Sequence, residues 1–352
     1  MRGGPANSST ALGRLADRRA RTNAVHSHDE GMVANVRIIV TGGAGFIGST
    51  LVDRLLGEGH EVACLDNFDN YYSPEVKRRN IARALQHPAY RLFEGDLRDQ
   101  DDVLELLREV RPEAVVHIAA RAGVRPSLED PRVYVDVNIH GTLNLLDAAR
   151  YTSRPRLLVA STSSVYGAET EVPFREDAPL TSIVSPYAAT KLGMEALCHT
   201  YSEVYDLRMC VFRLFTVYGP RQRPDMAIHK FTQRILNGQP IQLYAQGETY
   251  RDYTYVDDIV DGFCRGLSYD AAPWGVFNLG GGRPTNLRDL VAEIEKATGR
   301  SASIELAPPA DGDVPRTLAD ITRARQHLGY DPKTTVSEGV PKFVEWYLDE
   351  AR

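Results

Sequence analysis

The sequence predicts an α/β fold: a Rossmann-type, doubly wound parallel sheet followed by a smaller C-terminal α/β lobe. Two observations predict the sheet. Short apolar runs alternate with amphipathic helical stretches from Val36 to about Phe215, and a glycine-rich turn joins the first strand to the first helix. A third observation predicts the lobe, because after Phe215 the loops lengthen and Pro and Gly become frequent.

The first part of the chain is expected to form six strands and five helices. Strands that alternate with helices build βαβ units, so we expect them to be parallel and buried on both faces. The predicted strands are 37–41, 61–66, 90–95, 114–119, 156–161 and 208–215. The helical patterns begin near Phe46, Pro74, Asp99, Pro131 and Tyr187.

The second part is expected to pack at the carboxyl ends of the strands, where open α/β sheets bind ligands. Residues 241–245 and 276–280 are predicted to form short, isolated strands. Helices are expected at 228–237, 256–267, 286–297 and 336–348. Residues 1–34 are rich in Arg, Ser, Gly and Ala without periodicity, so we expect a disordered tail, with Met32 as an alternative start.

The composition gives no reason to expect nucleic acid or a membrane as a partner, since the net charge is -6 with 25% charged residues. No apolar run is long enough to span a bilayer, and we expect a cytoplasmic protein without a metal site. The cysteines are scattered and form no CxxC pair, which favours buried, reduced thiols. They are Cys64, Cys198, Cys210 and Cys264.

The run VTGGAGFIGS directly after the first strand predicts a dinucleotide site. Gly42, Gly45 and Gly48 permit a tight turn, and backbone N–H groups at the start of the following helix can then approach a pyrophosphate. Asp66 ends the second strand at about the ~20-residue distance expected for a ribose-binding acid. Its charge would repel a 2′-phosphate and so favours NAD over NADP, although a helix cap or turn residue is the alternative.

Further residues are expected to line the cofactor site. The segment 95–97 follows the third strand and could contact the adenine, and the small residues of 119–123 follow the fourth strand and let the dinucleotide lie close. The predicted cofactor contacts beyond the three glycines and Asp66 are Phe46, Ile47, Asn67, Asp96, Leu97, Ala119, Ala120, Tyr187 and Lys191.

The segment SPYAATK (185–191) predicts the catalytic pair. Tyr187 and Lys191 are four residues apart on an expected helix, so they share one face. A phenol with a pKa near ~10 is a poor base at neutral pH, but a lysine ammonium and an oxidised nicotinamide nearby favour the phenolate. A pair on the helix surface without a catalytic role is the alternative.

The glycine turn and this pair, together with STSSVYG (161–167), resemble the extended short-chain dehydrogenase/reductase family from about Val36 to the C-terminus. The resemblance implies tightly held NAD and commonly a homodimer built from paired helices. It also implies that Thr162, four residues before Tyr166, hydrogen-bonds the reacting sugar hydroxyl. With residues 1–34 as a tail, we expect an NAD-binding domain at 35–215 and a mainly substrate-binding lobe at 216–352.

Ser163 and Ser164 bear on the reaction. Relatives that eliminate water or decarboxylate a glucuronyl group resemble this segment but carry an added aspartate or glutamate in it. Two serines can orient a substrate but supply no second acid, which suits reversible hydride transfer at one carbon. The alternative is that they merely end a strand.

The segment RLFTVYGPRQRPDMA (213–227) resembles the matching segment of UDP-glucuronate 4-epimerases, a subgroup of that family. The resemblance implies that Thr216 and Arg223 face the sugar carboxylate, and a guanidinium can grip a carboxylate bidentately. An exposed structural arginine is the alternative. Arg221 and Gln222 depart from the bulky aromatic and small residue of many members, so the pocket rim is expected to differ.

The remaining substrate contacts follow from the same resemblance. Arg251 resembles the family's diphosphate-binding arginine, and Gln242 and Tyr244 are expected beside the uracil. The segments 122–131 and 312–320 also resemble the subgroup, which adds Arg125 and Asp313.

The expected reaction is the 4-epimerisation of UDP-glucuronate to UDP-galacturonate through a 4-keto sugar, with the substrate as the small-molecule partner. A UDP-glucose 4-epimerase and a decarboxylating UDP-xylose synthase are the alternative enzymes. A non-enzymatic NAD-sensing module is the alternative from another class, and it predicts a disrupted catalytic pair.

Overall fold

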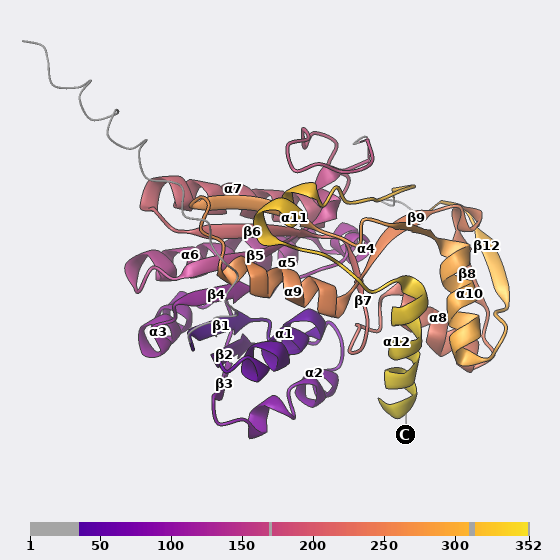
Figure 1. Cartoon of the computed structure of the whole chain (residues 1–352), viewed down its shortest axis with the longest axis horizontal. Coiled ribbons are helices and arrows are strands. Elements are labelled where there is room, and N and C mark those ends of the chain that lie inside the picture. Colours follow the sequence, from indigo (N-terminus) through magenta and orange to yellow (C-terminus); the bar gives the residue numbers. More distant parts are fainter. Residues whose placement is uncertain (1–34, 169–170, 310–313, 351–352) are drawn as a thin grey trace, which may run out of the picture. The chain divides into compact units, whose positions relative to one another are not determined.

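A seven-stranded parallel sheet lies at the centre of the computed structural model (Figure 1), which describes residues 35–168, 171–309 and 314–350. The strand order β10-β6-β5-β4-β1-β2-β3 runs outward from β1 in both directions, as in a doubly wound fold. The predicted fold class is therefore confirmed. The strands are β1 (Arg37–Thr41), β2 (Glu61–Asp66), β3 (Tyr90–Glu94), β4 (Ala114–His117), β5 (Arg156–Thr162), β6 (Met209–Leu214) and β10 (Trp274–Leu279).

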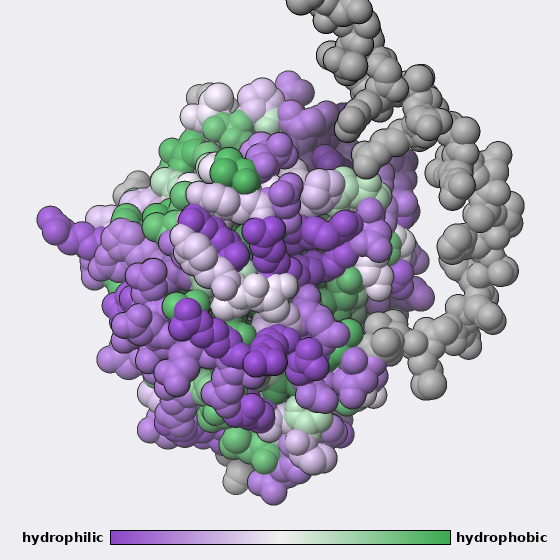
Figure 2. All heavy atoms as spheres, turned by 90° about the vertical axis from the view of Figure 1, so that its left-hand side faces the viewer, coloured by the Kyte–Doolittle hydropathy of each residue, from purple (hydrophilic) through white to green (hydrophobic). Residues whose placement is uncertain are grey.

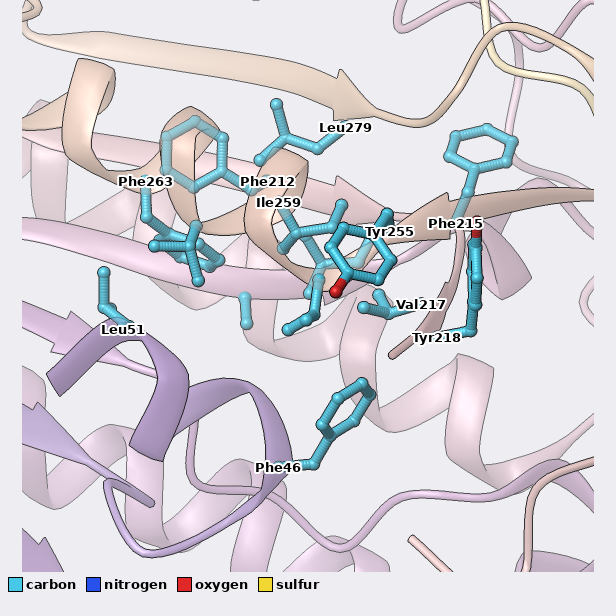
Figure 3. Packing of buried hydrophobic residues seen from close by; sticks show 14 of the residues in the cluster. Phe46, Leu51, Phe212, Phe215, Val217, Tyr218, Tyr255, Ile259, Phe263 and Leu279 are labelled. Carbon is cyan, nitrogen blue, oxygen red and sulfur yellow. The ribbon is translucent and has the colours of Figure 1, made fainter. Parts of the chain in front are cut away.

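The central strands are apolar because helices cover both faces of the sheet. On one face, α1 (Phe46–Gly57) packs against α9 (Val256–Leu267), and Figure 3 shows Leu51 and Phe263 pointing into the space between these two helices. On the other face, α3, α6 and α7 pack side by side over a second apolar cluster. These helices are α3 (Gln100–Val110), α6 (Gly141–Tyr151) and α7 (Pro186–Tyr205).

Side-chain caps fix where several helices begin. Asp99 accepts hydrogen bonds from the first backbone amides of α3, and Ser185 accepts one from Ala188 in α7. Asn286 caps α10 (Leu287–Thr298) in the same way. The shorter helices before α6 are α2 (Pro74–Asn80), α4 (Val124–Glu129) and α5 (Pro131–Val135), and a π-helical turn, Asp136–His140, joins α5 to α6.

Strand β10 corrects one prediction. Residues 276–280 were expected to form an isolated strand, but β10 pairs in parallel with β6 along its whole length, from Trp274 opposite Met209 to Leu279 opposite Leu214. The pairing explains the apolar pattern, since Phe277 is buried between the sheet and the helices. The later part of the chain therefore contributes the edge strand of the central sheet.

The other strands after residue 215 form two small sheets, one with the order β11-β9-β7 and one in which β12 pairs with β8. Because β7 follows β6 after a single residue, this region begins at the carboxyl end of the central sheet, on the right in Figure 1. The strands are β7 (Thr216–Tyr218), β8 (Ile241–Tyr244), β9 (Tyr250–Tyr255), β11 (Pro284–Asn286) and β12 (Ile304–Ala307). The helices are α8 (Ala227–Leu236), α10 (Leu287–Thr298), α11 (Thr322–Leu328) and α12 (Val336–Glu350).

The described residues, from Asn35 onward, cluster as one compact unit. Figure 2 shows one face of it as mostly hydrophilic, with only small hydrophobic areas. No helix among the described residues is long and apolar enough to cross a membrane. The predicted tail, 1–34, lies outside the described residues.

Candidate active site

A cavity of about 390 Å³ opens at the carboxyl ends of the central strands. The segments that follow β1, β2, β3, β4, β5 and β6 all contribute to its wall, together with one face of α7. The cavity thus lies at the edge of the sheet where doubly wound folds bind ligands. It brings together every predicted catalytic and cofactor residue, and also Ser163, Ser164, Thr216 and Arg223.

The glycine turn leaves no room for side chains. Gly42 has a φ of +71°, and a Cβ there would lie 2.8 Å from the Cα of Ala119. A Cβ on Gly48 would lie 2.1 Å from the carbonyl oxygen of Gly42. Gly45 precedes the first turn of α1, which has no side-chain cap and no acidic residue, so its free amides suit an anion.

Asp66 is buried at the end of β2 and faces this cavity. Its carboxylate accepts hydrogen bonds from the backbone amides of Ala44, at 3.1 Å, and Phe68, at 2.9 Å. The turn role considered as an alternative is therefore present, but a carboxylate has acceptor sites left for two hydroxyls. Lys77 lies with its Nζ 3.9 Å from Asp66 Oδ1 and also lines the cavity, which the sequence analysis missed.

Asn67 and Asp96 form a hydrogen-bonded pair at the same end of the cavity. Asn67 Nδ2 donates to Asp96 Oδ2 at 2.8 Å. Hydrogen bonds from Arg98 lower the pKa of Asp96 to about 2, so this carboxylate is ionised at neutral pH. Leu97 and the small side chains of Ala119 and Ala120 also line the cavity.

Helix α7 and strand β5 meet along three successive strand residues. Lys191 Nζ donates to the carbonyl oxygen of Ala160 at 2.8 Å, Ser161 Oγ donates to Glu195, and Thr162 shares a side-chain hydrogen bond with Tyr187. The three helix residues are spaced one turn apart, which is why one face of α7 can engage consecutive residues of the strand. Tyr187 and Lys191 are thereby fixed beside Thr162 in the cavity.

Burial shifts the pKa of both members of the catalytic pair, Tyr187 and Lys191. It raises the pKa of Tyr187, and the hydrogen bond with Thr162 and the charge of Arg223 only partly oppose the rise. It lowers the pKa of Lys191 to about 8, although the charge of Glu195 opposes this shift. The phenol therefore needs a further positive charge nearby before it can serve as a base at neutral pH.

A buried ion pair holds the next turn of α7. Glu195 accepts hydrogen bonds from Arg213 in β6, the shortest at 2.8 Å, and both side chains are at least nine-tenths buried. Arg213 also donates to the hydroxyl of Tyr166, which donates to Asn278 in β10. This network was not predicted from the sequence, although a glutamate and an arginine within apolar stretches were the available signal.

Thr162, Ser163 and Ser164 form the turn after β5. Thr162 Oγ1 accepts from the backbone amide of Ser164 at 3.2 Å and begins a 3₁₀ turn. The serines therefore do end a strand, as the alternative has it, but they also line the cavity.

Thr216 and Arg223 reach the same cavity from the segment after β6. The guanidinium of Arg223 is paired with Asp225 through Nε at 3.0 Å and Nη2 at 3.1 Å. Burial opposes its charge, but Asp225 outweighs this effect and raises the pKa of Arg223. A charged guanidinium thus lies in the same cavity as Tyr187, consistent with the predicted carboxylate contact.

Arg221 and Gln222 do not line the cavity. Arg221 Nη2 lies 2.7 Å from Asp53 in α1, and Gln222 is buried with its amide bonded to the backbone of Val217 and His229. Both residues instead fix the segment that carries Arg223.

Four other predicted contacts lie outside the cavity lining. The guanidinium carbon of Arg125 is 4.4 Å from the ring centroid of Tyr244, which joins α4 to β8. Gln242 is exposed on β8, and Arg251 Nη1 donates to the carbonyl oxygen of Tyr250 at 2.9 Å. Asp313 lies outside the described residues.

Several residues that line the cavity from the loops after β2 and β4 were not predicted from the sequence. The hydroxyl of Tyr72 is buried and has no hydrogen-bond partner among the described residues, so it is available to a ligand. The missed residues of these loops are Asp69, Tyr71, Tyr72 and Arg121.

Comparisons with known proteins agree with this geometry. The model of a family described as GDP-mannose 4,6 dehydratase matches residues 39–343. A protein of Rhizobium meliloti (strain 1021) named "Probable UDP-glucuronate 4-epimerase" is 40% identical over 331 residues, which cover 89% of this chain and 97% of the relative.

Solved structures are similar over the same span. UDP-glucuronic acid 4-epimerase from Bacillus cereus, in complex with UDP-glucuronic acid and NAD, gives a TM-score of 0.84 at 34% identity, over 89% of this chain and 99% of that chain. UDP-glucose 4-epimerase from Thermus thermophilus, in complex with NAD, gives 0.80 at 35% identity, over 89% and 99%.

Proposed function

Because this chain belongs to the GDP-mannose 4,6-dehydratase family of extended short-chain dehydrogenases/reductases, we propose that it catalyses the NAD-dependent 4-epimerisation of UDP-glucuronate to UDP-galacturonate. The observation that carries the proposal is that Arg223 and Thr216 share one cavity with Tyr187 and Thr162. A cation for the sugar carboxylate and a base for a sugar hydroxyl are thus within reach of one bound hexuronate.

NAD fits the other end of the cavity, where the glycine turn, the free amides of α1 and the carboxylate of Asp66 line the wall. When bound, NAD would supply reversible hydride transfer at C4 and a positive charge beside the buried phenol of Tyr187. Asp66 is proposed to accept hydrogen bonds from the adenosine ribose hydroxyls, Asp96 and Leu97 to contact the adenine, and Asn67 and Lys191 to be further cofactor contacts.

Transfer of the proton from the sugar O4 is assigned to side chains of this chain. We assign Tyr187 as the base that takes the proton from the sugar O4 and gives it back, with Thr162 orienting that hydroxyl through its bond to the phenol. Lys191, held by Ala160, keeps positive charge beside Tyr187. Ser163 and Ser164 offer hydroxyls but no acid, consistent with a reaction that neither dehydrates nor decarboxylates.

The orientation of the sugar carboxylate matters once C4 of the sugar is oxidised. The oxidised sugar is a β-keto acid, which loses carbon dioxide when the breaking bond aligns with the carbonyl. We propose that Arg223, Thr216 and the two serines keep the carboxylate out of that alignment. Arg251 is proposed to bind the diphosphate, and Gln242 and Tyr244 are proposed to lie beside the uracil. Arg125 and Asp313 are proposed as further substrate contacts.

The test is to incubate the purified protein separately with UDP-glucuronate and UDP-glucose and to identify the products by NMR. The proposal expects UDP-galacturonate from the acid, without carbon dioxide, and much slower turnover of the neutral sugar. Since a UDP-glucose 4-epimerase is about as similar to this chain, UDP-galactose as the main product would replace the proposed substrate while keeping the role of Tyr187.

We also propose a cytoplasmic homodimer. Exposed apolar side chains on α5, α6 and α7, namely Val135, Tyr151 and Val204, support pairing through these helices. The four free cysteines support a reducing compartment. Light scattering on the purified protein tests the dimer, which a monomer at micromolar concentration would contradict.

A further inference from the structure

The guanidinium proposed to bind the substrate already holds a carboxylate of this chain. Arg223 donates from Nε and Nη2 to the two oxygens of Asp225, at 3.0 and 3.1 Å. This is the side-on, bidentate geometry in which arginine binds carboxylates most strongly. Among the described residues Nη1 donates no hydrogen bond, so a single edge of the guanidinium is left for a ligand.

The loop after β2 supports Asp225 from across the cavity. The hydroxyl of Tyr71 donates to Asp225 Oδ2 at 3.3 Å. Burial and the charge of Asp225 raise the pKa of Tyr71, so this phenol stays a donor. The guanidinium of Arg223 lies over the ring of the same tyrosine, 5.5 Å from its centroid, and that of Arg121 lies 4.5 Å from it.

Each of these two arginines carries its own counter-ion. Arg121 pairs with Asp69 as Arg223 pairs with Asp225. The charges of these two arginines are therefore largely balanced by neighbouring carboxylates. The attraction between Arg223 and a substrate carboxylate is weaker than it would be for an unpaired guanidinium.

Epimerisation gives a reason why the attraction between Arg223 and the sugar carboxylate should be weakened. After C4 is oxidised, the 4-keto sugar must present its other face to the same hydride donor, and its carboxylate must leave its first contacts to do so. A guanidinium free to bind that carboxylate at full strength would hold the sugar in one orientation and slow the turn.

We propose that Asp225 is a positioning residue that competes with the substrate for Arg223 and so weakens the grip on the sugar carboxylate enough for the 4-keto sugar to turn. Tyr71 fixes Asp225 in this role through its hydroxyl. The inference rests on the proposed function, because it concerns the carboxylate of a UDP-hexuronate.

The test replaces Asp225 with asparagine, which keeps the size of the side chain and removes its charge. Binding is measured by calorimetry in a Tyr187→Phe background, where the sugar is not consumed, with UDP-glucuronate and UDP-glucose as ligands and NAD present. Because the pair is partly exposed, we expect the ratio of the two dissociation constants to shift toward UDP-glucuronate by about fivefold.

Turnover is measured in the background with Tyr187 intact. Asp225→Asn is expected to lower both KM and kcat for UDP-glucuronate and to raise the steady-state fraction of reduced cofactor, read at 340 nm. Asp177→Asn is the matched control, since Asp177 forms the same bidentate pair with an arginine two residues away, Arg175, outside the cavity. The control is expected to change neither the ratio of dissociation constants nor the reduced fraction.

Unchanged or weaker binding of UDP-glucuronate by Asp225→Asn would overturn the inference, as would an equal effect of the control. Asp225→Ala gives the same test if the asparagine variant fails to fold. Failure of the proposed function is distinguishable, because the parent enzyme would then turn over UDP-glucose and leave UDP-glucuronate unchanged.

Discussion

The two ends of the sugar-binding half of the cavity are built differently. At the catalytic end, Tyr187, Lys191 and Thr162 lie on α7 and β5, and Lys191 is bonded to the backbone. At the carboxylate end, Arg223 lies on a loop, about one fifth exposed, and its partner is a neighbouring aspartate. The proposed bond chemistry therefore rests on buried side chains of a helix and a strand, whereas the proposed selection of the substrate rests on a partly exposed ion pair of a loop.

Removing the phenol hydroxyl at the catalytic end should have the largest effect. Tyr187→Phe is expected to lower kcat for UDP-glucuronate by about 10²–10⁴-fold, because proton transfer from O4 loses its base. Binding of UDP-glucuronate, measured by calorimetry, is expected to stay within a few fold. A variant that keeps most of its kcat would show that Tyr187 is not the base.

Breaking the buried pair behind α7 should come next. Glu195→Gln leaves the guanidinium of Arg213 buried without a counter-charge, so we expect the free energy of unfolding to fall by about 3 kcal/mol in urea titrations. Adding Arg213→Met removes the stranded charge and is expected to recover part of the loss. Additive losses in the double variant would contradict this account of the pair.

At the carboxylate end, removing the guanidinium should affect selection more than stability. Arg223→Ala is expected to raise KM for UDP-glucuronate by about 10–100-fold, the worth of hydrogen bonds to a charged group, and to change KM for UDP-glucose far less. The ratio of kcat/KM for the two sugars measures this effect. An equal loss with both sugars would reduce Arg223 to a structural role.

The smallest effect is expected for the ion pair between Arg221 and Asp53. Both side chains are about one quarter exposed, and pairs of this kind contribute between about 0 and 1 kcal/mol. Urea titration of Asp53→Asn should therefore give a loss well below that of Glu195→Gln. Losses of similar size would remove the contrast between the buried and the exposed pairs.

The same contrast explains what could be predicted from the sequence. The strands, the glycine turn and the spacing of Tyr187 and Lys191 follow from periodicity and local sterics, and the structure places them as expected. The sheet edge at β10 was missed because parallel pairing with β6 joins segments that are about sixty residues apart, which no local pattern reveals.

Side-chain partners that lie far apart in the sequence could not be predicted either. Nothing local links Tyr71 to Asp225, 154 positions away, or Glu195 to Arg213 on another element. Resemblance to a subgroup of the family predicted that Thr216 and Arg223 face the sugar carboxylate. It did not predict that Arg223 already forms an ion pair with Asp225. Long-range partners set the charge that a ligand meets, and only the fold brings them together.

The most direct test of the central claim, that the carboxylate end protects the oxidised sugar while the catalytic end converts it, is a product analysis of Arg223→Ala beside the parent enzyme. Both are incubated with UDP-glucuronate labelled with ¹³C at the carboxylate and followed by NMR. Labelled UDP-galacturonate is expected from the parent, and labelled carbon dioxide with an unlabelled UDP-pentose is expected from the variant. Clean epimerisation by the variant, without carbon dioxide, would contradict the claim.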